Sequence, residues 1–322
     1  MPPMHILRTQ QFDKDWLDGF FWKVTKLKRE FSTNPGRLEL RSSLQGRLCF
    51  SVFFEPSTRT RFSFESAAHH LGMGVVASEN AGEFSSIVKG ELPEHMLRVL
   101  CGYRPDVIVW RHKATGIAER IAPIASECGV PLINAGDGTG QHPTQALLDV
   151  YTIVEHFGSA ENLTVVIGGD LRYGRTVKSL TYLLAKFVGV RFVFISPREL
   201  AMDEGVLTHL RTHRVPFEEA SVSSAFELNR ALNRADVVYW TRVQNERMGD
   251  ELKASVASAS RQYRITLEQA GSLKSNAILL HPMPINGEIE SAVDTHPCAK
   301  YFRQADNGLF VRMALFQKML GF

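Results

Sequence analysis

Short apolar runs alternate with longer amphipathic stretches along most of the 322 residues, and this alternation constrains the fold more than any other feature. It is typical of βαβ units, in which helices join parallel strands. The runs are continuously apolar, which predicts strands that are covered on both faces. They fall into two series. The predicted strands cover residues 48–54, 75–78, 107–110 and 131–134, and then 163–167, 192–196, 237–240 and 277–281.

Two α/β domains fit the two series, each with a doubly wound, mainly parallel sheet covered by helices. Residues 144–156 lie between the series, so we expect a helix to join the domains. The final stretch, residues 301–320, has apolar residues at helical spacing. This apolar face must pack against a core, which we expect to be that of the first domain. The predicted domains are residues 1–143 with helix 300–322, and residues 144–299. Other predicted helices cover residues 12–28, 57–71, 92–101, 118–128, 176–187 and 226–233, and the longest predicted mobile loop covers 248–264.

Composition excludes several classes of protein. Lys and Arg total 37 and Asp and Glu total 34, so the net charge of +3 is too small for binding of nucleic acid by charge alone. The sequence has neither an apolar run of membrane-spanning length nor the pattern of a signal peptide, and we expect a cytoplasmic protein without a membrane partner. The cysteines are far apart and form no C-x-x-C, which favours buried thiols over a zinc site. They are Cys49, Cys101, Cys128 and Cys298.

An apolar run leads into a predicted helix through Ser57-Thr58-Arg59-Thr60-Arg61. Backbone N–H groups, hydroxyls and a guanidinium would converge there at the positive end of a helix dipole. The segment therefore predicts a phosphate site. It lacks the Gly-Lys of a P-loop, which disfavours a nucleoside triphosphate. The alternative is a simple helix cap flanked by surface arginines.

His142 and Gln145 lie three residues apart at the start of the helix that joins the domains. Both side chains lie on one helix face and can reach one ligand. The alternative for His142 is a helix-start residue that is satisfied by the backbone. Gly168-Gly169-Asp170 lacks the G-x-G-x-x-G spacing, and the next strand ends without an acidic residue, so NAD binding is disfavoured.

Arg175, Arg242 and Gln244 each follow a predicted strand of the second domain. The carboxyl edge of an open α/β sheet is where ligands bind, and forked guanidinium donors match carboxylate oxygens. A dicarboxylic amino acid fits two such arginines. The alternative for each arginine alone is a surface position.

Taken in order, these segments resemble the aspartate and ornithine transcarbamoylase family over nearly the whole chain. The further matching motifs are Lys89-Gly90-Glu91, Arg111-His112, Asn134-Ala135-Gly136-Asp137-Gly138, His142-Pro143-Thr144-Gln145, Gly174-Arg175-Thr176, Thr241-Arg242-Val243-Gln244 and His281-Pro282-Met283-Pro284. The ornithine branch typically has His-Cys-Leu-Pro at the last motif. The resemblance therefore implies transfer of a carbamoyl group from carbamoyl phosphate to L-aspartate, a reaction of pyrimidine biosynthesis that needs no metal or organic cofactor.

The resemblance also implies roles for individual residues. The carbamoyl phosphate group comprises Ser57, Thr58, Arg59, Thr60, Ser85, Lys89, Arg111, His142 and Gln145, with Arg59, Thr60, Arg111, His142 and Gln145 as the catalytic residues. The aspartate group comprises Lys89, Arg175, Arg242, Gln244, Met283 and Pro284, and Glu55 and Arg247 are expected to make domain-closing contacts. The family further implies a homotrimer with shared active sites, in which the loop with Ser85 and Lys89 enters the neighbouring subunit. Regulatory or pathway-enzyme partners stay open.

Three places depart from the usual family pattern, all on the acceptor and domain-closure side. Leu92-Pro93-Glu94-His95 replaces Ser/Thr-Leu-x-Asp, Asn245 stands where lysine is common, and Ile285 where arginine is common. These departures leave open the alternative that the chain is a paralogous carbamoyltransferase that uses another amine acceptor. A non-catalytic carbamoyl phosphate-binding subunit is the remaining alternative.

Overall fold

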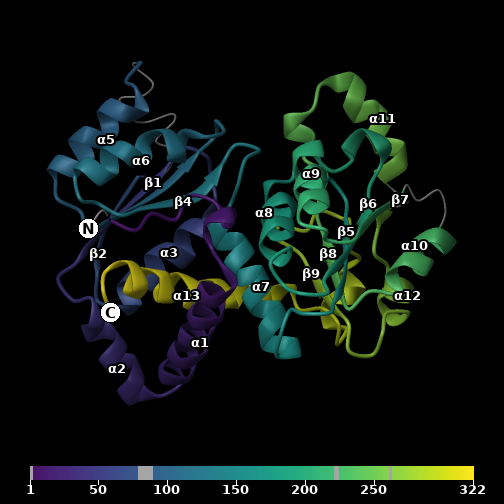
Figure 1. Ribbon diagram of the computed structural model, residues 1–322, viewed down its shortest axis with the longest axis horizontal. Helices are drawn as coiled ribbons and strands as arrows, with labels where there is room; N and C mark the ends of the chain where they lie inside the picture. Colours follow the sequence, from purple (N-terminus) through teal and green to yellow (C-terminus); the bar gives the residue numbers. More distant parts are fainter. Residues whose placement is uncertain (1–2, 79–89, 221–224, 261–262) are drawn as a thin grey trace. The chain divides into compact units, whose positions relative to one another are not determined.

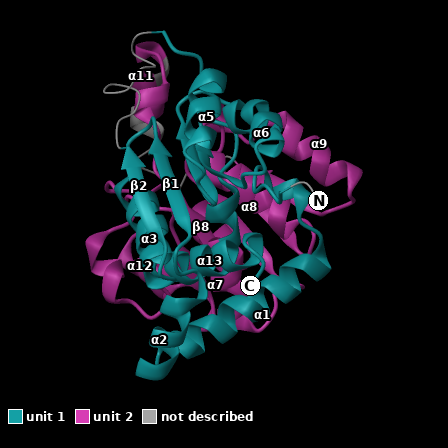
Figure 2. Cartoon of the chain, turned by 90° about the vertical axis from the view of Figure 1, so that its left-hand side faces the viewer, with its two compact units in different colours: residues 1–147, 306–322 teal, residues 148–305 magenta. Residues whose placement is uncertain are grey.

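The computed structural model describes residues 3–78, 90–220, 225–260 and 263–322 (Figure 1). The chain divides into two compact units (Figure 2). Unit 1 consists of residues 1–147 and 306–322, and unit 2 of residues 148–305. Both boundaries fall inside a helix, α7 (Pro143–Phe157) and α13 (Tyr301–Met319), slightly later in the chain than the sequence predicts.

Unit 1 contains a four-stranded parallel sheet in the order β2-β1-β3-β4. The chain moves outward from β1 to β2 and then returns to β3 on the other side of β1. The sheet therefore has a topological switch point between the carboxyl ends of β1 and β3, the usual place for a ligand in open α/β sheets. The strands are β1 (Leu48–Phe53), β2 (Gly74–Ser78), β3 (Val107–His112) and β4 (Leu132–Asp137).

Helices cover both faces of this sheet. On one face, Ile108 and Trp110 pack with Leu97 and Ile121 from α5 and α6. On the other, the hydroxyl of Ser51 donates to Glu65 of α3, at 3.0 Å. The helices of unit 1 are α1 (Lys14–Phe31), α2 (Asn34–Ser43), α3 (Thr58–His70), α5 (Pro93–Gly102), α6 (Ile117–Glu127), the start of α7 and the end of α13, with the 3-10 helix η1 (Thr9–Gln11).

Unit 2 contains a five-stranded parallel sheet in the order β7-β6-β5-β8-β9, with its switch point between β5 and β8. Val166, Val238 and Leu279 lie in one core with Leu228 of α10 and Tyr301 of α13. The strands are β5 (Thr164–Gly168), β6 (Arg191–Ile195), β7 (Phe217–Ala220), β8 (Val237–Trp240) and β9 (Ile278–Leu280). The helices are α8 (Arg175–Leu184), α9 (Glu204–Thr212), α10 (Ala225–Leu232), α11 (Asp250–Ser260) and α12 (Leu267–Gly271), with 3-10 helices η3 (Arg198–Leu200), η4 (Asn245–Arg247) and η6 (Ser291–Thr295).

The predicted fold class is confirmed, and two local predictions are wrong. The predicted loop 248–264 contains helix α11, whose Ala- and Ser-rich sequence has little apolar periodicity; Val256 is buried. Cys128 is exposed, whereas the other three cysteines are buried as expected. In the described part of the chain, no helix is both long and apolar enough to cross a membrane.

Candidate active site

The Ser57–Arg61 segment forms the turn from β1 into α3. Ser57 precedes the first helical residue, Thr58, and the carbonyl of Ser57 accepts from the N–H of Arg61, at 3.0 Å. Within the described structure, the Ser57 side chain makes no capping hydrogen bond to this helix, so a simple cap does not explain its presence. The N–H groups of the first turn have no acceptor inside a helix. Hydroxyl and N–H donors therefore meet at the positive end of α3.

Thr60 and Arg59 differ in their exposure on this turn. Thr60 is buried, while Thr58 and Arg59 are exposed. The protein atoms around the guanidinium lower the pKa of Arg59 by desolvation. An arginine stays charged in proteins, so Arg59 keeps a cation at the helix end.

Arg111 lies at the carboxyl end of β3, directly opposite Phe53 of β1. Only 7% of its surface is exposed. Its Nη1 donates to the carbonyl of Ala135 on β4, at 3.0 Å, and its Nη2 pairs with Oε2 of Glu55, also at 3.0 Å. The guanidinium is therefore held from both neighbouring strands at the switch point of unit 1.

His142 is buried and directly precedes α7. Its carbonyl accepts from the N–H groups of Gln145 and Ala146, at 3.0 and 3.2 Å, and its Nδ1 lies 3.4 Å from the Thr144 hydroxyl. The half-buried Gln145 is in the first turn of the same helix. As predicted, the two residues share the start of one helix.

Asp137 fixes the loop that carries His142, and sequence reasoning gave this carboxylate no role. Its Oδ1 accepts from the N–H of Gln141, at 2.7 Å, and its Oδ2 from the N–H of Gly116, at 2.9 Å. The loop after β4 is thus tied to the start of α6. The ends of β1, β3 and β4 together bring the Ser57–Arg61 segment, Arg111 and His142 to one edge of the sheet.

Asp170 connects the two loops at the switch point of unit 2. It is fully buried, and its two oxygens accept from the N–H groups of Tyr173 and Gln244, at 2.9 and 3.0 Å. Burial raises the pKa of Asp170, and these backbone donors oppose that rise. The predicted site residue Gln244 is therefore anchored through its backbone to the loop after β5.

Gly169 allows these loops to approach each other. Its φ of +105° lies in the region that favours glycine, and a Cβ there would meet the Thr241 carbonyl oxygen at 2.0 Å. The chain then enters α8 at Arg175, which is buried. Arg175 and Arg242 each follow a strand, as the sequence predicts, and these two strands, β5 and β8, are neighbours in the sheet.

Arg242 already engages a carboxylate of its own chain. Its guanidinium pairs with both oxygens of Glu246 in η4, with Nη1 3.0 Å from Oε2. This hydrogen bond raises the pKa of Arg242 and lowers that of Glu246, against the desolvation of both groups. Arg247 follows in the same short helix. Sequence reasoning missed Glu246, although its i,i+4 spacing from Arg242 is a visible signal.

A buried hydrogen-bond network holds the His281–Pro284 turn. The Met283 N–H donates to Nδ1 of His281, at 2.8 Å, so Nε2 carries the ring proton and donates to Glu288, also at 2.8 Å. Gln304 accepts from the His281 N–H and donates to Asp149, at 2.9 and 2.6 Å. The Met283–Pro284 peptide bond is cis. These contacts hold the backbone at Met283 and Pro284, which are two of the residues predicted to bind aspartate.

Two predicted residues, Ser85 and Lys89, lie outside the described residues. Glu55 pairs with Arg111 inside unit 1, and its predicted domain-closing contact, like that of Arg247, stays a prediction. The described residues contain no cluster of three or more His, Cys, Asp or Glu side chains placed to hold a metal ion.

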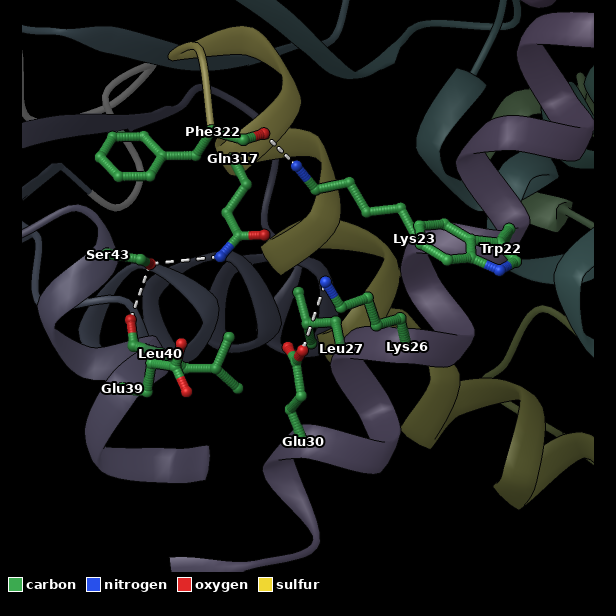
Figure 3. Close-up of a pocket in the computed structure, with 10 residues that line it drawn as sticks. All are labelled: Trp22, Lys23, Lys26, Leu27, Glu30, Glu39, Leu40, Ser43, Gln317 and Phe322. Carbon is green, nitrogen blue, oxygen red and sulfur yellow. Dashed lines mark hydrogen bonds and ion pairs between the residues drawn. The ribbon is translucent and has the colours of Figure 1, made fainter. Parts of the chain in front are cut away.

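A pocket of about 300 Å³ in unit 1 lies away from these residues (Figure 3). Side chains of α1, α2 and the end of α13 line it, and none of the predicted site residues does. Its polar groups pair with each other: Gln317 donates to Ser43, at 3.2 Å, and Lys26 pairs with Glu30, at 3.7 Å. This pocket is therefore not the candidate active site.

Fold and site together define a two-domain α/β protein with hydroxyl, N–H and guanidinium donors at one switch point and two arginines at the other. Residues 4–155 match the family "Aspartate/ornithine carbamoyltransferase, carbamoyl-P binding domain", and residues 161–319 match its "Asp/Orn binding domain". The chain therefore belongs to the aspartate/ornithine carbamoyltransferase family.

Relatives in this family align with almost the whole chain. A chloroplastic aspartate carbamoyltransferase of Arabidopsis thaliana is 43% identical over 98% of this chain and 77% of its own length. The aspartate carbamoyltransferase catalytic subunit of Aliivibrio fischeri is 38% identical over 98% of this chain and 96% of its own length. The aspartate transcarbamoylase of Trypanosoma cruzi has been solved in complex with N-(phosphonacetyl)-L-aspartic acid. It superposes with a TM-score of 0.88 and is 33% identical, and the match covers 98% of this chain and 95% of that one.

Proposed function

We propose that this chain is an enzyme that transfers the carbamoyl group of carbamoyl phosphate to the α-amine of L-aspartate. The products are N-carbamoyl-L-aspartate and phosphate, and the reaction belongs to pyrimidine biosynthesis. The observation that carries the proposal is the buried Arg111, fixed by Glu55 and Ala135 at the same switch point as the Ser57–Thr60 turn. Relatives named aspartate carbamoyltransferase support aspartate as the acceptor.

The donor half of the reaction uses unit 1. Ser57, Thr58, Arg59 and Thr60 hold the phosphate oxygens through hydroxyls, backbone N–H groups and charge at the start of α3. Arg111 is fixed at this edge as a second cation. Thr60, Arg111 and His142 donate to the carbonyl oxygen as it gains negative charge, and their burial strengthens that stabilisation. Gln145 orients the carbamoyl NH2 group.

The acceptor half uses unit 2. Arg175, Arg242 and Gln244 read the carboxylates of aspartate, and the carbonyls of Met283 and Pro284 accept from NH2 groups. The neutral α-amine attacks the carbonyl carbon, a C–N bond forms, and the C–O bond to phosphate breaks. The departing phosphate takes up the proton that the amine loses.

A panel of amines tests this proposal. Carbamoyl phosphate is supplied with L-aspartate, L-ornithine and other amino acids, and phosphate release is measured. Turnover with aspartate alone supports the proposal. Turnover with a different amine, or saturable binding of carbamoyl phosphate without turnover, contradicts it. An Arg59→Ala, Thr60→Ala double variant should lose turnover with the substrate that works, because the phosphate clamp is gone.

We further propose a homotrimer in which Lys89 and Ser85 of one copy complete the site of its neighbour. The Lys89-Gly90-Glu91 motif supports this assembly by resemblance. Mixing an inactive Lys89→Ala variant with an inactive His142→Ala variant should restore part of the activity, because mixed trimers contain some sites with both native residues. Absence of any recovery in mixed trimers, with the trimer mass verified by light scattering, would contradict shared sites.

We also propose a cytoplasmic location, which is the expectation from the composition of the chain. The plant relative is named chloroplastic and is longer than the aligned region. Cell fractionation with an antibody against the chain distinguishes the two locations.

A further inference from the structure

Helices α5 and α6 lie side by side and run in the same direction in unit 1 (Figures 1 and 2). Near their amino ends, Glu94 of α5 pairs with Arg120 of α6, at 2.6 Å. Near their carboxyl ends, Arg98 pairs with Glu127, at 3.3 Å. The two ion pairs fix the register, so the carboxyl ends of the helices lie together.

A cysteine lies at each of these carboxyl ends. Cys101 is one turn beyond Arg98, and Cys128 directly follows Glu127 and closes α6. Besides burial, the neighbouring Cys128 thiol acts on Cys101 and raises the pKa of its thiol. Cys101 belongs to the core under these helices, whereas Cys128 is exposed. One thiol is therefore accessible from solvent, and the second lies at the adjacent helix end.

We propose that Cys101 and Cys128 form a redox-sensitive thiol pair, which a small disulfide oxidant of the glutathione type converts into an intrachain disulfide between α5 and α6. The thiolate of Cys128 attacks one sulfur of the oxidant, forms a mixed disulfide and releases one glutathione thiolate. The Cys101 thiolate then attacks Sγ of Cys128, which forms the protein disulfide and releases the second glutathione. The two thiol protons end on the two glutathiones, and two electrons pass to the oxidant.

The environment assigns the order of these steps. Burial and the neighbouring Cys128 raise the pKa of Cys101 to about 12, while Arg98 acts in the opposite direction. Because a thiolate is the nucleophile, the exposed Cys128 reacts first and Cys101 resolves the mixed disulfide. We therefore expect closure of the disulfide to accelerate as the pH rises.

The cross-link would close the segment from residue 101 to residue 128, which includes β3 and therefore Arg111. A covalent bond between two ends of the same layer restricts the unfolded chain. The oxidised protein should thus unfold at a higher temperature than the reduced protein, and the shift should disappear after treatment with dithiothreitol.

Alkylation and mass spectrometry test the proposal. The reduced chain is incubated with oxidised glutathione, then unfolded and treated with iodoacetamide. Of the four cysteines, Cys49 and Cys298 should take the label, and a proteolytic peptide with Cys101 should be linked to one with Cys128. Labelling of all four cysteines would overturn the proposal, as would glutathione on Cys128 with a labelled Cys101.

Two variants separate the roles of the thiols. Cys101→Ala should retain glutathione on Cys128, because nothing displaces it, while Cys128→Ser should keep its three remaining thiols reduced. The Cys128 variant changes an exposed side chain and leaves the core intact. Formation of an intrachain disulfide in the Cys128→Ser variant would contradict the assignment.

Discussion

The guanidinium of Arg111 and the carboxylate of Glu55 form an ion pair of 3.0 Å where β1 and β3 end side by side. Arg111 is buried, so its orientation depends on the partners that surround it. Glu55 is the acidic partner and the Ala135 carbonyl the neutral one. Glu55 is thus a positioning residue for the donor site.

Replacement of Glu55 by glutamine should lower kcat/KM for carbamoyl phosphate by roughly tenfold or more. A hydrogen bond to a charged group contributes about 1.5–3 kcal/mol, and about 1.4 kcal/mol corresponds to tenfold. The KM for carbamoyl phosphate should rise more than the KM for aspartate. Steady-state kinetics with each substrate varied in turn measure both effects.

Glu127→Gln is the matched control for this variant. Glu127 pairs with Arg98 near the carboxyl ends of α5 and α6, at the opposite edge of the sheet from the switch point, and its loss should leave the kinetics unchanged. Activity of Glu55→Gln within twofold of the parent would show that Arg111 does not need this carboxylate.

Arg242→Ala should raise the KM for aspartate by about 10- to 100-fold, because a charged hydrogen bond to a substrate carboxylate is lost. Binding of carbamoyl phosphate should stay nearly intact, since its proposed ligands lie in unit 1. Isothermal titration with carbamoyl phosphate and kinetics with aspartate separate the two. Arg234→Ala, which removes an exposed partner of Glu218, is the control. Equal weakening of both substrates would argue against the role of Arg242.

Gly169→Ala should destabilise the protein and reduce activity. The new Cβ would lie 2.0 Å from the Thr241 carbonyl oxygen at a positive φ, so the loops after β5 and β8 must separate. We expect a loss of more than about 2 kcal/mol, since strained backbone and a steric clash add. Denaturant unfolding measures the loss.

Gly271→Ala serves as the control for that substitution. Gly271 lies in α12 and a Cβ there would meet nothing within 4 Å, so alanine should leave stability unchanged or raise it by up to about 1 kcal/mol. Similar effects of the two substitutions would refute the packing argument for Gly169.

Glu288 makes the stability of the turn at Met283 dependent on pH. Burial alone would raise the pKa of Glu288, but the hydrogen bond from His281 together with backbone donors lowers it below the ordinary 4.5. The folded chain then binds this proton more weakly than the unfolded chain. Ionised Glu288 therefore stabilises the folded chain. This stabilisation is complete above pH 4.5 and is lost as the pH falls through the pKa of Glu288 in the folded chain.

Glu288→Gln should therefore flatten the fall in unfolding temperature below pH 4.5. Thermal unfolding between pH 3 and 7 measures this dependence, and Glu268→Gln on the exposed surface of α12 is the control. If the unfolding temperature of Glu288→Gln falls with pH as steeply as that of the parent, the His281–Glu288 contact does not stabilise the folded chain as argued.

The fold class was predictable because buried parallel strands leave continuous apolar runs in the sequence. β7 (Phe217–Ala220) escaped prediction because two of its four residues are glutamates on an exposed edge. Helix α11 escaped because Ala and Ser carry no amphipathic pattern. These two elements depend on tertiary contacts, which a local sequence pattern does not reveal.

The donor turn was predictable because Ser57 to Thr60 are contiguous, so one local pattern contains hydroxyls, charge and a helix start. Long-range partners were not predictable. The pairing of Asp170 with the Gln244 backbone depends on the order of β5 and β8, which no local pattern contains. The same holds for the contact of Gln304 with Asp149.

The most direct test of the central claim follows the carbamoyl carbon itself. Carbamoyl phosphate labelled with ¹³C is incubated with L-aspartate and the purified chain, and the products are analysed by mass spectrometry. We predict labelled N-carbamoyl-L-aspartate in amounts equal to the phosphate released, with formation strongly reduced in Arg111→Ala. Phosphate release without labelled N-carbamoyl-L-aspartate, or unchanged product formation by Arg111→Ala, would contradict the account.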